Sequence, residues 1–362
     1  MTANRGLFFL TFCVSVCITC EPIAKAQKSE QVSIVATVEL VQIPVIVFDD
    51  KGKVATNLKK SDFRLLEDGV EQKILYFERE RLPVSFVIVA DVSSSMTNKI
   101  PFVQEAALSL LNPLPQQDQY LDEYSVLGIG KRVKLLMPFT RDQEDLERRL
   151  PLLLTATNES TALFDGVWLG VNTARREASN QRRAMIIISD GGDNHSRYNL
   201  RETRELLEEA DVPVFAVKAG PLFELPSIFL GEDKKRKRFP TGRESVPQFP
   251  SLPMGRSQTD YIGPAERRGP HILSTLTEVT GGGVFTANDE EDLPRIVRTI
   301  GLAVRYQYVL TYKPLHEGRT EARREKGAEE NGFHKIHLEL YPKENFKGYG
   351  IPYYKRRYRS VE

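Results

Sequence analysis

The sequence predicts an α/β fold, in which a Rossmann-like, mainly parallel sheet carries helices on both faces and the N- and C-terminal flanks build a small β domain. Three observations lead to this prediction. The run Val84–Ala90 is almost entirely apolar, as in a strand buried on both faces of a parallel sheet. Strand-like runs then alternate with amphipathic helical stretches as far as Val304. Outside this region, apolar residues recur at every second position.

The α/β region contains its predicted elements in alternating order. Apolar residues at helical spacing predict helices that begin near Pro101, Thr161, Leu200, Ile272 and Leu293. Apolar, often β-branched runs predict further strands near 124–129, 133–139, 184–189, 212–217 and 284–287. Because the loops that follow parallel strands gather at one edge of a sheet, that edge is where we expect a ligand to bind.

The N-terminal flank has the pattern of a small antiparallel β unit. Residues 38–47 are rich in β-branched side chains. Further on, Asp68-Gly69 separates the strand-like runs Phe63–Glu67 and Val70–Phe77, and this dipeptide is a strong signal for a two-residue hairpin turn.

The C-terminal flank also predicts strands. Residues 306–312 and 336–340 alternate with a period of two, and the basic, aromatic stretch 353–358 is typical of an edge strand. We expect these strands to return to the N-terminal unit and complete one β domain. The predicted segments are a signal peptide at 1–26, an N-terminal β unit at 33–80, an α/β domain at 83–304 with an insertion at about 219–269, and C-terminal strands at 305–362.

The first 26 residues have the features of an export signal. Arg5 precedes a short apolar core, and Ala24-Lys25-Ala26 forms a cleavage site. The core is too short to span a bilayer, and no later run is longer, so we expect no transmembrane segment and a periplasmic or extracellular location. Lipoprotein anchoring at Cys20 is the alternative, disfavoured because the residues before Cys20 lack the usual leucine.

Removal of this segment changes the composition in two ways. All three cysteines lie within it, so the mature chain would have no disulfides, cysteine nucleophile or cysteine metal ligands. The remaining basic and acidic residues are equal in number, which does not favour nucleic acid as a partner.

Oxygen-bearing side chains follow two of the predicted strands. Asp91-x-Ser93-x-Ser95 comes after the first buried strand, Asp190 comes after the strand at 184–189, and Thr161 opens a helix in a loop at the same edge. Oxygen ligands of this kind suit Mg²⁺, with Mn²⁺ or Ca²⁺ as alternatives. The other explanation is that the serines and Thr161 only cap helices. The predicted metal ligands are Asp91, Ser93, Ser95, Thr161 and Asp190.

These motifs resemble a von Willebrand factor type A domain with its metal-ion-dependent adhesion site. The resemblance covers roughly residues 83–304 and includes Asp190-Gly191 after an apolar strand. It implies that Ser93 and Ser95 ligate the metal directly and that Asp91 and Asp190 act directly or through water. Thr161 would change between direct and water-bridged contact. In this chain Glu159-Ser160 stands where members often carry a glycine pair.

The segment before the domain extends the resemblance. Leu58, Asp62-Phe63, Glu67-Asp68-Gly69 and Gln72 are similar to the corresponding segment of exported bacterial proteins called VWFA-related acidobacterial domain proteins. The resemblance implies a non-enzymatic, adhesion-type module. An open coordination position on its cation would be completed by an Asp or Glu of a partner protein.

Two other functions are compatible with the sequence. A metal-assisted hydrolase would need a general base beside the ion, and His195 is the one histidine expected near that edge. A metal-free envelope scaffold would bind through its β domain instead. The basic run at 234–238 in the insertion either helps to recruit an acidic partner or is a solvated loop.

Overall fold

The structure is a computed structural model that describes residues 40–79, 81–111, 122–157, 159–219, 269–289, 291–314 and 333–359. The predicted signal peptide and all but the ends of the predicted insertion lie outside these residues. Within the described part of the chain, no helix combines the length and the apolar character needed to cross a membrane.

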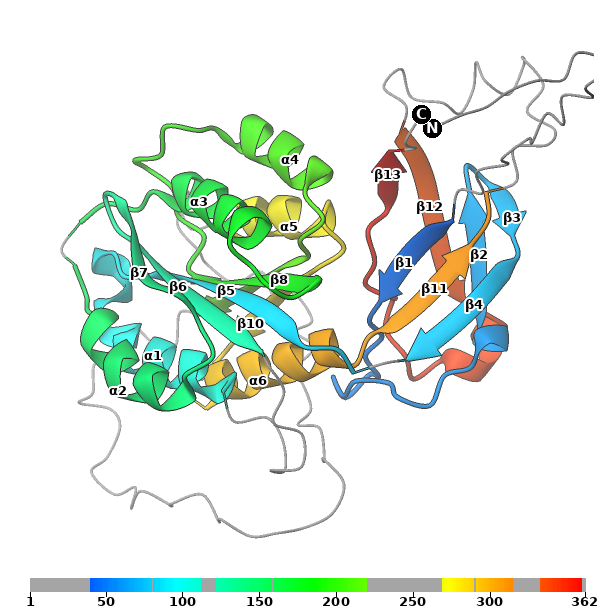
Figure 1. Cartoon of the computed structure of the whole chain (residues 1–362), viewed down its shortest axis with the longest axis horizontal. Coiled ribbons are helices and arrows are strands. Elements are labelled where there is room, and N and C mark those ends of the chain that lie inside the picture. The colour runs from blue at the N-terminus through cyan, green and yellow to red at the C-terminus, as the bar shows by residue number, and fades with distance from the viewer. Residues whose placement is uncertain are drawn as a thin grey trace, which may run out of the picture. The chain divides into compact units, whose positions relative to one another are not determined.

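A six-stranded sheet forms the centre of the α/β domain (Figure 1). Its order is β10-β9-β8-β5-β6-β7, and every neighbouring pair is parallel except β6 and β7. The central strand β5 is buried along its whole length, as its apolar run predicts. The strands are β5 (Val84–Asp91), β6 (Glu123–Ile129), β7 (Val133–Thr140), β8 (Arg182–Ser189), β9 (Val214–Ala219) and β10 (Val284–Ala287).

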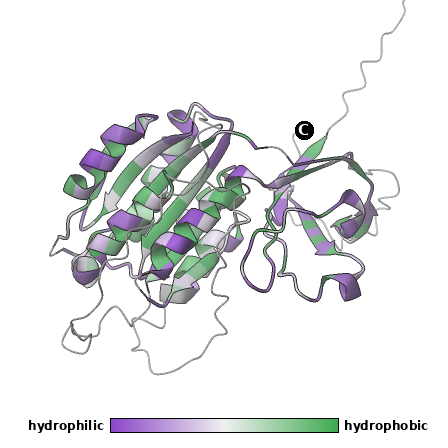
Figure 2. Cartoon of the chain, turned by 90° about the horizontal axis from the view of Figure 1, so that it is seen from below, coloured by the Kyte–Doolittle hydropathy of each residue, from purple (hydrophilic) through white to green (hydrophobic). Residues whose placement is uncertain are grey.

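Within the described ranges, three helices cover each face of this sheet. The apolar side chains of α1, α2 and α6 pack against one face, and those of α3, α4 and α5 pack against the other. Figure 2 shows the largely hydrophobic strands between helices that carry both hydrophobic and hydrophilic residues. The helices are α1 (Ile100–Ser109), α2 (Gln143–Leu153), α3 (Leu163–Arg176), α4 (Leu200–Glu209), α5 (Gly269–Glu278) and α6 (Asp292–Arg305). The predicted fold class is therefore confirmed.

Helix α3 lies unusually close to the sheet. A Cβ atom on Gly166 would come within 2.8 Å of the Ile129 side chain, and one on Gly170 within 2.8 Å of Met185. Both glycines therefore allow an approach that a larger residue would obstruct. This packing places the loop that precedes α3 beside the ends of β5 and β6.

The flanks form two antiparallel sheets that share one core. One sheet has the order β1-β11-β4 and the other β13-β12-β2-β3, so each contains strands from both ends of the chain. Apolar residues of both sheets belong to a single buried cluster. The strands are β1 (Val41–Val45), β2 (Phe63–Glu67), β3 (Val70–Gln72), β4 (Ile74–Arg79), β11 (Tyr308–Tyr312), β12 (Phe333–Leu340) and β13 (Arg357–Arg359).

The predicted hairpin is correct at its turn and wrong in the length of its second strand. Asp68 and Gly69 have φ angles of +48° and +79°, as a two-residue hairpin turn requires. The run Val70–Phe77, however, is divided at Lys73 into β3, which pairs with β2, and β4, which pairs with β11. The chain can leave one sheet and enter the other within this stretch because both sheets bury side chains in the same core.

Candidate functional site

The predicted ligands lie at the carboxyl edge of the central sheet. Asp91 is the last residue of β5, and Asp190 directly follows β8. The two strands are parallel neighbours with Ala90 opposite Ile188, so their carboxylates emerge side by side. Thr161 lies two residues before α3, whose close packing brings it to the same edge.

Asp91 is held in one orientation by two hydrogen bonds. Its side chain is completely buried. Oδ1 accepts a hydrogen bond from the backbone N–H of Ser93 at 3.0 Å, and Oδ2 accepts one from the hydroxyl of Ser189 at 2.7 Å. Ser189 Oγ in turn accepts the N–H of Gly191 at 3.0 Å, which ties β5 to the turn after β8.

The electrostatics of Asp91 favour a cation nearby. Burial raises the pKa of Asp91, and the hydrogen bonds from Ser93 and Ser189 oppose this shift. The negative charge of Asp190 raises the pKa further. Among the described residues, no ion pair reaches either carboxylate. A divalent ion would supply the compensating charge that these two acids lack.

The two serines provide neighbouring hydroxyl groups on the same loop. Ser93 Oγ and Ser95 Oγ are 3.3 Å apart. Ser93 is buried, with 1% of its surface exposed, whereas Ser95 is exposed to solvent. The site thus runs from the buried Asp91 carboxylate outward to solvent, as an ion with one open coordination position requires.

Backbone contacts hold Thr161 between the other two loops. Its N–H donates to Asn194 Oδ1 at 2.9 Å, and its carbonyl accepts the N–H groups of Asn194 at 3.0 Å and His195 at 3.1 Å. On the other side, the carbonyl of Glu159 accepts the N–H of Ser94 at 3.2 Å. Glu159, one of the two residues that stand in place of the glycine pair, therefore joins the threonine loop to the serine loop.

These contacts link the five predicted residues to different degrees. Ser93 bonds directly to Asp91 and Ser95. Thr161 donates its N–H to Asn194 in the loop after β8. Asp190 follows Ser189, whose hydroxyl bonds to Asp91, and its own carboxylate accepts the N–H of Gly192. Metal ligation by the five residues stays a prediction. Ser189 and Asn194 support the site but were not among the predicted residues. In the sequence, Ser189 is a polar residue next to Asp190 at the end of a strand, and Asn194 is a polar residue four positions after Asp190. These positions alone do not distinguish the two residues from ordinary loop residues.

A hollow of about 640 Å³ lies beside this edge. Its aromatic wall is formed by Trp168 and Tyr198, whose rings stack with centroids 3.9 Å apart. Arg197 forms an ion pair with Asp165 at 3.1 Å on the same wall. Lys131, Arg132 and Arg197 line the hollow together with one acidic residue, Asp165.

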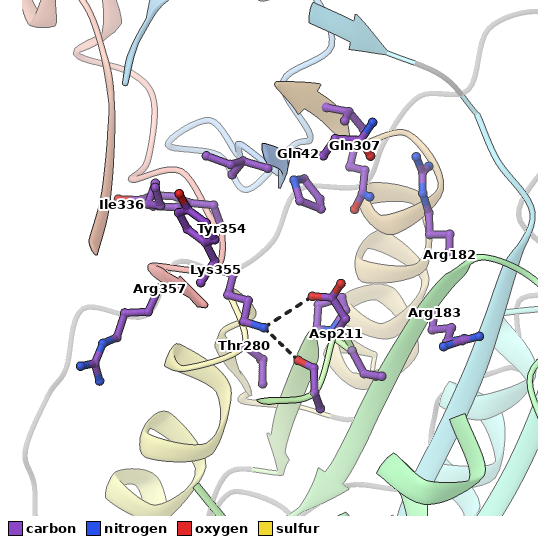
Figure 3. Close-up of a pocket in the computed structure, with 18 of the residues that line it drawn as sticks. Gln42, Arg182, Arg183, Asp211, Thr280, Gln307, Ile336, Tyr354, Lys355 and Arg357 are labelled. Atoms are coloured by element: carbon purple, nitrogen blue, oxygen red, sulfur yellow. Dashed lines mark hydrogen bonds and ion pairs between the residues drawn. The ribbon is translucent and has the colours of Figure 1, made fainter. Parts of the chain in front are cut away.

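A second cavity, of about 840 Å³, lies at the opposite edge of the sheet, where β8 and β9 begin (Figure 3). Lys355 reaches into it and contacts the carbonyl of Ala210 at 3.3 Å and the Asp211 carboxylate at 3.5 Å. Arg182 and Arg183 also line it, together with acidic and apolar residues. Because this lining is mixed and Lys355 already contacts Asp211, we assign no ligand to the cavity.

Comparison with known proteins identifies the α/β domain. Residues 86–192 match the family model described as von Willebrand factor type A domain. A search of curated protein sequences finds no match. The matched residues contain all five predicted ligands, in strands and loops of the expected order.

Several solved structures resemble the chain. A von Willebrand factor type A protein from Catenulispora acidiphila is 10% identical over 89% of this chain and 74% of its own, with a TM-score of 0.44. The conserved hypothetical protein BatB from Bacteroides thetaiotaomicron is 16% identical over 61% and 99%, with a TM-score of 0.39. Proximal thread matrix protein 1 from the mussel byssus, with a zinc-occupied MIDAS motif, is 14% identical over 66% and 49%, with a TM-score of 0.41. These values are low, so the domain assignment rests on the matched residues.

Proposed function

Because residues 86–192 form a von Willebrand factor type A domain, we propose that the chain is a metal-dependent protein-binding module. Asp91, Ser93, Ser95, Thr161 and Asp190 hold the ion, with Mg²⁺ as the first choice and Mn²⁺ or Ca²⁺ as alternatives. An Asp or Glu side chain of a partner protein completes the coordination. The single observation that carries this proposal is the buried Asp91, which is beside Asp190 and has no cationic partner in the described part of the chain.

The donor set suits binding of an external carboxylate. Two carboxylates balance the charge of a divalent ion, while the serine and threonine hydroxyls add no charge. The ion therefore retains affinity for a further anionic ligand. The exposure of Ser95 leaves a path by which such a ligand can approach.

The hollow beside the site supports an acidic partner. Lys131 and Arg132 line it, and their positive charges attract an acidic segment before its carboxylate reaches the ion. The stacked Trp168 and Tyr198 offer an aromatic surface for apolar residues around that carboxylate.

We propose that the module acts outside the cytoplasm, as the features of residues 1–26 suggest, and that it is not an enzyme. The alternative, metal-assisted hydrolysis, would use His195 as the general base. His195→Ala separates the two functions: it abolishes hydrolysis in an enzyme, whereas a binding module retains metal-dependent affinity for its partner.

Calorimetric titration of Mg²⁺ into the full chain tests the metal site. We expect binding of one ion in the unmodified protein and its loss in Ser93→Ala. Ser94→Ala is the matched control, because Ser94 is the exposed residue between the two predicted serine ligands. Equal Mg²⁺ affinity in the Ser93 variant and the Ser94 control would contradict the proposal.

Acidic peptides then test partner recognition. Immobilised protein should retain Asp- or Glu-containing peptides in Mg²⁺ and release them in EDTA. Peptides with Asn or Gln at the same positions are the controls, since an amide is a much weaker ligand for the ion. If neither EDTA nor the amide replacement changed the amount of retained peptide, carboxylate capture would be contradicted.

A further inference from the structure

A second group of metal-ligating side chains lies in the β domain. Glu67, Asp68 and His334 each present one ligand atom, and these atoms all lie within 4.8 Å of one another. His334 Nδ1 is 2.9 Å from Asp68 Oδ2 and 3.4 Å from Glu67 Oε1. The three residues are in the antiparallel sheet β13-β12-β2-β3, outside the domain that contains Asp91.

The strand pairing brings these residues together across the sequence. Glu67 ends β2 and lies opposite Ile336 of β12, while Asp68 follows in the hairpin turn. The N–H of Asp68 donates to the carbonyl of Lys335 at 2.9 Å, next to His334. A residue from the C-terminal flank therefore meets two consecutive acids from the N-terminal flank.

The separations suit a small divalent metal. Zinc binds imidazole nitrogen and carboxylate oxygen at about 2.0–2.2 Å, so neighbouring ligand atoms in a tetrahedral site are about 3.3 Å apart. The two distances from His334 Nδ1 to the carboxylate oxygens lie on either side of this value. One nitrogen and two carboxylate oxygens also favour zinc over Mg²⁺, which prefers oxygen ligands alone.

Hydrogen bonds already orient both carboxylates. Tyr358, opposite His334 on β13, donates its hydroxyl to Glu67 Oε1 at 2.9 Å. The N–H of Lys335 donates to Asp68 Oδ1 at 2.9 Å, which leaves Oδ2 toward His334. Partners of this kind fix metal ligands in place and strengthen binding.

A buried hydroxyl beside the cluster is an independent observation. The Tyr312 side chain is completely buried, and its hydroxyl has no hydrogen-bond partner within the described residues. Burial raises the pKa of Tyr312, and the negative charges of Glu67 and Asp68 raise it further. A water bound to a metal at the cluster would give the Tyr312 hydroxyl a hydrogen-bond partner.

We propose that Glu67, Asp68 and His334 form a second metal site, selective for a divalent transition metal of the zinc class. The ion completes its coordination with water on the side of Tyr312. The ion connects β2 to β12 and so links the N-terminal flank to the C-terminal flank. The site is independent of the proposed adhesion function and of the ligands around Asp91.

Cobalt(II) spectroscopy on the full chain tests this site, with Ser93→Ala in the background to remove binding at the sheet edge. Four-coordinate cobalt with an imidazole ligand gives intense visible bands, whereas six-coordinate cobalt in an all-oxygen site gives weak ones. We expect intense bands that zinc displaces with one ion per chain. Absence of such bands, or zinc that fails to displace them, would overturn the proposal.

Substitutions assign the ligands. His334→Ala should abolish the bands, and His337→Ala is its matched control, because His337 is exposed on the same strand. Asp68→Asn removes a ligand charge yet preserves the turn, since Asn tolerates a positive φ. This variant keeps the test decisive if His334→Ala does not fold. Tyr358→Phe should weaken zinc binding by about 10- to 100-fold. Unchanged bands in Asp68→Asn would overturn the assignment.

Discussion

Ser189 and Asp91 are joined by a 2.7 Å hydrogen bond from the serine hydroxyl to Oδ2 of the carboxylate. The bond connects the ends of two neighbouring parallel strands and is completely buried. It holds the deepest predicted ligand in one orientation, with Oδ1 fixed by the N–H of Ser93.

Ser189→Ala should weaken Mg²⁺ binding without removing a ligand. Loss of the hydroxyl leaves Asp91 Oδ2 without its donor, so the pKa of Asp91 rises further and less of the carboxylate is ionised at a given pH. We expect a loss of affinity of about 10- to 100-fold, as for other residues that orient a metal ligand. Calorimetric titration between pH 5 and 8 measures the effect. An affinity equal to that of Ser94→Ala at every pH would show that the bond does not matter.

Asp91→Asn should stabilise the metal-free protein at neutral pH. Burial raises the pKa of Asp91 in the folded state, so the folded chain binds this proton more tightly than the unfolded chain. The stability from this group is therefore fully present below the unfolded pKa and is lost as pH rises through the folded pKa. The amide carries no charge at any of these pH values, so the advantage of the variant should grow as pH rises.

Thermal unfolding in EDTA at several pH values measures this difference, with each 1 kcal/mol worth about 2–4 °C. Addition of Mg²⁺ should reverse the order, because only the unmodified protein gains stability from the ion. A variant that melts below the parent in EDTA at pH 7 would contradict the electrostatic account.

Arg305→Ala should destabilise the α/β domain strongly. Arg305 is completely buried at the end of α6, and its Nε donates to Asp122 Oδ2 at 2.6 Å. A second guanidinium nitrogen donates to the carbonyl of Leu110 at 3.0 Å and to the hydroxyl of Tyr124 at 2.9 Å. Truncation leaves the Asp122 carboxylate buried without its cation, which typically costs about 3–5 kcal/mol.

Urea unfolding of the full chain checks this value. Arg298→Ala is the matched control, because Arg298 is exposed on the same helix and its loss should change stability by less than about 0.5 kcal/mol. Similar losses in the two variants would show that the buried pair contributes no more than a surface charge.

Binding of an acidic peptide should change the fluorescence of Trp168. This is the only tryptophan of the chain, and it lines the hollow beside the site. A carboxylate captured by the ion brings its flanking residues against the stacked Trp168 and Tyr198 rings. We expect a change in Mg²⁺ that EDTA reverses and that added salt weakens. An identical change with the Asn-containing control peptide would exclude carboxylate capture.

The sequence predicts some elements well and misses others for identifiable reasons. The Val84–Ala90 run predicts β5 because a short, nearly continuous apolar stretch rich in β-branched residues is typical of a strand buried on both faces. Helix α2 was not predicted, because it is highly charged and contains Pro151. Its N-terminus is nevertheless marked by Asp142, which accepts the N–H of Asp145 at 2.9 Å.

The residue pattern alone determined that oxygen ligands follow two buried strands and that both flanks are β structure. Only the tertiary structure decided which other side chains lie beside the predicted ligands and between the two flanks. Ser189 faces Asp91, and His334 meets Glu67, because strand register brings together residues that are far apart in the sequence. Periodicity reports which face of an element is apolar, whereas register between distant strands depends on how the whole chain packs.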